Sequence, residues 1–134
     1  MRKFVKWSSV VPLLVIVLVA ILPAAVFAQE NTVDVQLSPN TISLHSNGGV
    51  ISLHVDINYG LVVTEDLELV LNEEFPVSIL YTFADDRGDL VIKCSIDEVK
   101  EIVSVSEGTA TFDLTVVTTD GIYTGTDSAR VVGR

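Results

Sequence analysis

The sequence has few of the residues that cross-link small exported domains or that bind polyanions. Its 134 residues include one cysteine, Cys94, one tryptophan, Trp7, and 8 basic against 18 acidic side chains. A lone cysteine excludes an internal disulfide framework, so we expect packing to stabilise the fold. The acidic excess argues against binding to nucleic acid or to an anionic membrane surface, because like charges repel.

The first 28 residues have the pattern of a secretory signal peptide. An apolar run over residues 10–22 follows a cationic start, and Pro23 ends it shortly before Ala28. This order predicts a signal helix, export and cleavage after Ala28. A retained membrane anchor is the alternative, since residues 7–28 are long enough to span a bilayer.

Cleavage there would leave one domain over residues 29–134, secreted or associated with the cell envelope and outside the membrane. The removed segment carries three basic and no acidic side chains, so the remaining 106 residues have a net charge of −13. They contain no tryptophan, which excludes the Cys-Trp-Cys signature of antibody domains. The missing tryptophan also disfavours a sugar-binding platform, which needs large outward aromatic faces.

Apolar and polar residues alternate through most of the remaining chain, as in half-buried antiparallel strands. The clearest run is 51–57, and similar runs cover 33–37, 41–45, 67–71, 77–83, 90–94, 110–116, 122–125 and 129–132. Asp120-Gly121 predicts a tight hairpin turn. With turn signals roughly every ten residues, the pattern predicts an all-β antiparallel sandwich of about 7–8 strands.

One segment departs from the alternation and predicts a short helix over about 95–103. Ser95 and Glu98 have the spacing of a capping box. Apolar residues then recur at helical spacing, at Ile96, Val99, Ile102 and Val103.

The sequence offers little support for catalysis. His45 and His54 are its only histidines, and with Asp56 they could bind zinc. Their spacing of nine and their place on the polar side of each run favour solvated strand residues instead. The serines lie in no nucleophile motif, so we expect no enzymatic activity and no resident cofactor.

An acidic turn is the candidate metal site. Asp85, Asp86 and Asp89 could supply oxygen ligands to calcium, although their spacing departs from the full calcium-loop pattern and Arg87 adds a positive charge. A solvated acidic turn is the alternative. Arg87-Gly88-Asp89 is also the tripeptide that integrins read in other proteins, a match short enough to occur by chance.

Cys94 alternates in step with Leu90 and Ile92, which indicates a small core residue. A metal ligand or a disulfide to a partner chain is the alternative interpretation.

Several motifs resemble a family of immunoglobulin-like modules found in secreted archaeal and bacterial proteins, often at the C-terminus. The family's opening run, P-x-T-L-N-L-x-S-x-G, is matched by Pro39, Thr41, Ile42, Leu44, Ser46 and Gly48. Its aspartate-rich middle loop is partly reproduced by Asp85, Asp89, Leu90, Ile92 and Lys93. Its closing motif is matched by Asp120, Gly121, Tyr123, Gly125, Asp127, Arg130 and Val131. The resemblance implies an immunoglobulin-like sandwich with a short helix after the aspartate loop, and it implies no known activity.

These observations leave two functional hypotheses. The first is a secreted, non-enzymatic module that binds or spaces an unknown protein or surface partner. The second is a structural subunit that forms homo-oligomers by strand exchange, in which Gln29–Leu37 adds to a neighbour's sheet.

Overall fold

A computed structural model of the protein describes residues 31–103 and 108–133. The predicted signal helix and its cleavage site therefore lie outside the described residues. Within the described ranges, no helix is long and apolar enough to cross a membrane.

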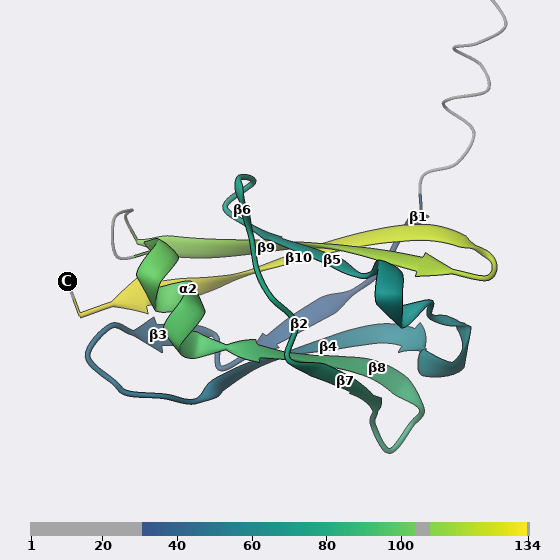
Figure 1. Ribbon diagram of the computed structural model, residues 1–134, viewed down its shortest axis with the longest axis horizontal. Helices are drawn as coiled ribbons and strands as arrows, with labels where there is room; N and C mark the ends of the chain where they lie inside the picture. The colour runs from purple at the N-terminus through teal and green to yellow at the C-terminus, as the bar shows by residue number, and fades with distance from the viewer. Residues whose placement is uncertain (1–30, 104–107, 134) are drawn as a thin grey trace, which may run out of the picture. The chain divides into compact units, whose positions relative to one another are not determined.

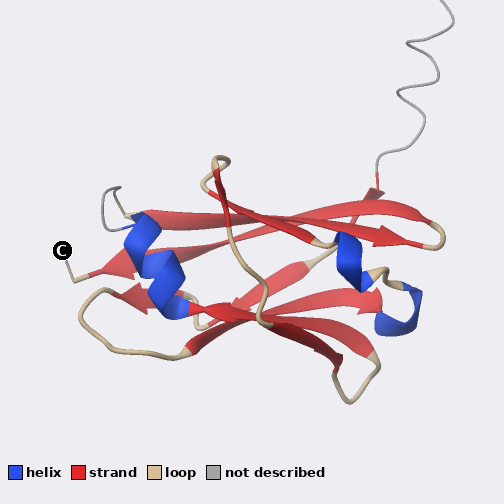
Figure 2. Ribbon diagram, viewed as in Figure 1, coloured by secondary structure: helices blue, strands red, loops and turns tan. Residues whose placement is uncertain are grey.

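The described residues fold into two β-sheets that pack face to face (Figures 1 and 2). Sheet A contains β1 (Asn31–Thr32), β10 (Gly121–Val132), β9 (Thr109–Thr118), β5 (Glu68–Leu71) and β6 (Phe75–Pro76) in that order, and β3 (Thr41–Ser43) also pairs with β10. Sheet B has the order β2 (Val35–Ser38), β4 (Val50–Asn58), β8 (Asp89–Ser95) and β7 (Tyr81–Ala84). The prediction of an all-β sandwich is confirmed.

Short helical segments connect the strands. The 3-10 turns η1 (Tyr59–Leu61) and η2 (Thr64–Asp66) lie between β4 and β5. Helix α2 (Ile96–Val103) follows β8, as predicted, and buries Val99 and Val103. The Ser95 hydroxyl accepts a hydrogen bond from the Glu98 N–H at 3.3 Å, so Ser95 caps the helix. The Glu98 carboxylate accepts instead from the Ser78 N–H at 3.2 Å, so it ties the helix to the chain before β7.

The strand count and pairing differ from the prediction. The described residues form ten strands, of which β1 and β6 have two residues each, and both β1 and β3 pair with β10 in parallel. The predicted runs 122–125 and 129–132 are one continuous strand, β10, and the predicted strand 33–37 is divided between the two sheets. Segment 33–37 is divided because the chain crosses from sheet A to sheet B between Val33 and Val35, within uninterrupted alternation.

At the edges of the sandwich, the chain crosses between the sheets from β1 to β2 and from β6 to β7 (Figure 1). At one flank the Val33 N–H donates to the Thr124 carbonyl of sheet A at 2.9 Å. One residue later, the Asp34 carbonyl accepts a hydrogen bond from the Asp56 N–H of sheet B at 3.0 Å. At the other flank Val77 donates to Leu69 of sheet A, so the predicted strand 77–83 begins only at Tyr81.

Gly125 lies under the first crossing. A Cβ at Gly125 would meet both the Val33 carbonyl oxygen and the Val35 Cγ2 at 2.5 Å, closer than real Cβ contacts come. Glycine is therefore required there by the close approach of a neighbouring backbone.

The core fills the space between the sheets. Its largest fully buried side chains come from β3, β4, β5, β8 and β9, together with α2: Phe112, Ile42, Ile51, Leu53, Leu71, Leu90, Ile92 and Leu114, with Val55, Val99 and Val103. Since alternate residues of each strand point inward, the opposite side chains of sheet B form its outer face.

Cys94 belongs to this core, as predicted, and its thiol has no solvent exposure. Burial raises the pKa of Cys94 to about 12, so only about one thiol in ten thousand is ionised at pH 8. We expect a thiol reagent such as Ellman's reagent to leave the native protein unlabelled and to modify one thiol per chain in denaturant. Rapid labelling of the folded protein would contradict this packing.

Candidate functional site

The outer face of sheet B brings together the side chains that carry charge and exposed aromatic surface. Strand register places Gln36 opposite His54, His54 opposite Val91, and Val91 opposite Phe83. Val91 alternates with core residues, so it points outward, yet it is fully buried. Neighbouring outer-face side chains therefore pack over Val91, so the side chains of this face contact one another.

One edge of this face is apolar. Leu80, Tyr81 and Phe83, which we call the edge patch, are 52%, 54% and 40% exposed. The rings of Tyr81 and Phe83 stack with centroids 6.2 Å apart, and the Lys93 ammonium lies 5.7 Å from the centre of the Phe83 ring. The rings are thus held in place while much of their surface stays in water.

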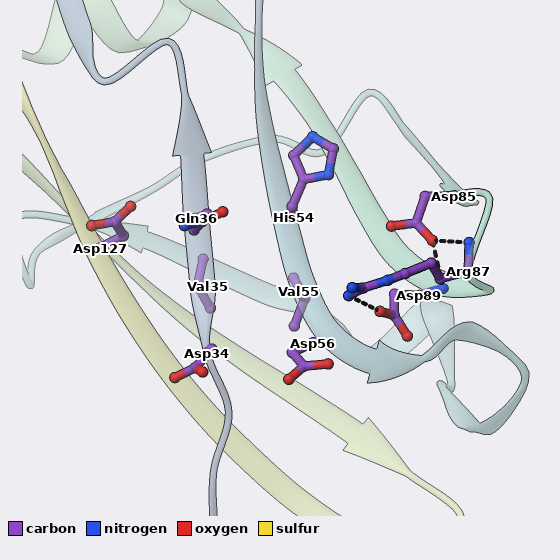
Figure 3. A pocket seen from close by; sticks show the side chains of 10 residues that line it. All are labelled: Asp34, Val35, Gln36, His54, Val55, Asp56, Asp85, Arg87, Asp89 and Asp127. Atoms are coloured by element: carbon purple, nitrogen blue, oxygen red, sulfur yellow. Dashed lines mark hydrogen bonds and ion pairs between the residues drawn. The ribbon is translucent and has the colours of Figure 1, made fainter.

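The other part of the outer face is an acidic cavity of about 500 Å³. Five aspartates line it, and Figure 3 shows them around His54, Gln36 and Arg87: Asp34, Asp56, Asp85, Asp89 and Asp127. The set is assembled from β4, β8, β10, the turn after β7 and the residue before β2.

The predicted metal-binding residues lie in a turn whose polar groups bond to one another. Asp85 Oδ1 accepts from the backbone N–H groups of Arg87 and Asp89, each at 2.9 Å. The Arg87 guanidinium donates to Asp89 Oδ2 at 2.8 Å. Asp85 and Asp89 line the cavity, whereas Asp86 is exposed and does not line it.

In the described part of the chain, no group of three or more histidine, cysteine, aspartate and glutamate side chains is arranged to hold a metal ion. Calcium binding by Asp85, Asp86 and Asp89 stays a prediction. The two histidines lie in different surroundings: His54 lines the cavity, and His45 lies beside Gly133 outside it.

Sequence reasoning missed Asp34 and Asp127 as members of the cavity. Asp127 Oδ2 accepts from the Leu37 N–H at 2.9 Å and so caps a backbone group on the open side of β2. This bond joins residues 90 positions apart in the sequence. The sequence contained one signal, because Asp127 is part of the closing motif, but that motif does not specify a partner.

The turn makes stability depend on pH through Asp85. The pKa of Asp85 lies below its usual 3.8, chiefly because its carboxylate accepts the Asp89 N–H. The stabilisation is complete above pH 3.8 and is lost as the pH falls through the lowered pKa of the folded state.

We therefore expect Asp85→Ala to lower the melting temperature at neutral pH, because both N–H groups lose their acceptor. Asp85→Asn keeps an acceptor oxygen without a charge, so its melting temperature should lie between those of Asp85→Ala and the wild type. Melting curves recorded from neutral pH to well below 3.8 should show the wild type converging on Asp85→Asn. A gap that is independent of pH would contradict the role of the charge.

No protein-family model matches this chain, and no curated protein matches it either.

Proposed function

We propose that the protein is a secreted, non-enzymatic, immunoglobulin-like module that binds a protein partner through the outer face of sheet B. The main support for this proposal is the edge patch, in which three large apolar side chains are exposed beside a charged cavity. Exposed apolar clusters with a polar rim are typical of protein interaction sites, and tyrosine is enriched in their centres.

The strand order supports the immunoglobulin-like type. In constant-type immunoglobulin domains, strands A, B, E and D form one sheet and G, F and C form the other. Taking β2, β4, β5, β7, β8, β9 and β10 as A to G reproduces both orders. The resemblance in the opening and closing motifs points to the same type.

The cavity groups support binding in preference to catalysis. The carboxylates of Asp85 and Asp89 accept hydrogen bonds from groups of the turn itself, and Arg87 is paired with Asp89. The lowered pKa of Asp85 keeps that group a carboxylate, whereas a general acid needs a raised pKa.

Site-specific photo-cross-linking tests the proposal. A photoreactive phenylalanine analogue in place of Tyr81 should yield one defined protein adduct on cells that export the module. The matched control carries the analogue in place of Ile122, which is 56% exposed but lies on sheet A. Equal adducts at both positions, or none at Tyr81, would refute the proposal.

Strand exchange is the second candidate, and one observation favours it. β1 is held by two residue pairs and β2 by four, so the N-terminal strands have few bonds to lose. In an exchanged oligomer these strands would occupy the same positions in a neighbour. Light scattering should then show concentration-dependent oligomers that disappear when residues 29–38 are deleted, and a monomer in both forms would exclude exchange.

A further inference from the structure

The open edge of β7 is the part of this surface whose chemistry can be defined further. Among residues 31–103 and 108–133, β7 is the last strand of sheet B and pairs only with β8. The Asp85 N–H donates to the Asp89 carbonyl at 2.9 Å, which marks a hydrogen-bonded pair. Because such pairs alternate along an antiparallel ladder, Tyr81 and Phe83 face β8, and the backbone groups of Thr82 and Ala84 point away from it.

We infer that β7 accepts an extended segment of the partner as an added strand, and that this segment carries lysine or arginine. The inference rests on the proposed function, since it names the partner of the same face. An added strand would satisfy the N–H and C=O groups of Thr82 and Ala84.

The edge patch defines the apolar side chains of such a segment. Tyr81 and Phe83 point to the outer face, so every second side chain of an added strand would lie beside them. Thr82 points the other way, where its hydroxyl lies 3.3 Å from the Tyr59 hydroxyl. Apolar side chains are therefore expected at alternate positions, on the outer face only.

Charge complementarity assigns the basic residues. Asp85 and Asp86 follow β7 directly, and at its other end the Glu98 carboxylate lies 3.2 Å from the Ser78 nitrogen. Both ends of an added strand would therefore lie near carboxylates, which favour cationic side chains there, whereas the Lys93 ammonium over Phe83 disfavours them at the middle of the strand. A second copy of the same edge would bring like charges together in an antiparallel pair, which disfavours self-association there.

Two capped octapeptides test the inference. In one, lysines at both ends flank a central run in which valine alternates with threonine, and in the other glutamates replace these lysines. The lysine peptide should bind the protein at least about tenfold more tightly than the glutamate peptide does, and its affinity should fall with added salt. Its binding should shift the Thr82 and Ala84 amide resonances in NMR spectra of the wild type.

Variants distinguish the contribution of the β7 backbone to binding from that of its side chains. Ala84→Pro removes an outward N–H and keeps the pairing with β8, so it should weaken binding at least about tenfold. Phe83→Ala should weaken it to a similar degree by removing half of the ring pair. Ile122→Ala, on the other sheet, should leave binding unchanged. Melting curves establish that each variant is folded, and the wild-type amide shifts test the edge independently of them.

Equal binding of both peptides, no binding of the lysine peptide, or unchanged amides at Thr82 and Ala84 would overturn the inference. Concentration-dependent dimers that Ala84→Pro abolishes would also overturn it, because the edge would then pair with a second copy. A Tyr81 photo-adduct without peptide binding removes this inference and leaves the proposed function standing. Absence of the adduct removes the proposed function itself.

Discussion

Replacing Phe112 with alanine should lower the free energy of unfolding by about 3–5 kcal/mol. Phe112 is the largest of the fully buried side chains and lies in β9, between Leu71 of β5 and Asp127 of β10. Removing its ring deletes apolar contacts from the centre of the sandwich and leaves a cavity that the two sheets cannot close completely. Urea unfolding followed by circular dichroism measures the loss.

Phe83→Ala is the matched control for this prediction. It deletes the same ring, but from a side chain that is 40% exposed on the outer face. We expect it to cost less than about 1 kcal/mol of stability, because the cost of deleting a ring grows with its burial. Comparable losses for the two variants would mean that the edge patch is part of the core, which would contradict its role as a binding surface.

Gly125→Ala should destabilise the protein by about 2–3 kcal/mol and should release the N-terminal strands in particular. The added methyl group would meet the Val33 carbonyl oxygen and the Val35 side chain at 2.5 Å. The backbone of β10 is fixed by ten residue pairs with β9, so the crossing segment must move instead. Hydrogen exchange should accelerate first at the Val33 and Asp56 amides, which bond across this crossing.

Gly60→Ala provides the comparison for Gly125→Ala. A Cβ at Gly60 would meet only the Asn58 Oδ1, at 3.2 Å, and a shift of a few tenths of an ångström relieves this contact while Asn58 still accepts the Gly60 N–H. The melting temperature should change little. If Gly60→Ala and Gly125→Ala lowered it equally, the effect would come from loss of glycine in general and not from the crossing.

Sequence patterns were sufficient where one run of alternation corresponds to one strand. Residues 51–57 were predicted as a strand and form the middle of β4, and Ser95 was identified as the helix cap. The prediction for 77–83 was wrong in extent, because Val77 bonds to sheet A while Leu80 bonds to sheet B. Period-two alternation gives the inward side chains and carries no information about which sheet receives them.

The acidic cavity could not be predicted for a related reason. Asp34 and Asp127 are 93 positions apart, and only the packing of sheet A on sheet B brings them to one cavity. The edge patch was partly visible, since Tyr81 and Phe83 alternate with Thr82 in the sequence. The alternation would place these apolar rings inward, but the register of β7 with β8 puts Thr82 beside the core residue Ile92 and both rings on the outer face.

The parallel pairing of β1 and β10 determines how the domain responds to mechanical force. β1 lies at one end of the sandwich and the C-terminus at the opposite end (Figure 1). Tension that pulls Asn31 and Gly133 apart therefore slides β1 along β10 and loads the bonds at Asn31, Thr32 and Val33 together. A hairpin pulled at its open end would instead lose its bonds one at a time. β1, which has only two residue pairs with β10, thus lies where a stretched chain is held in shear.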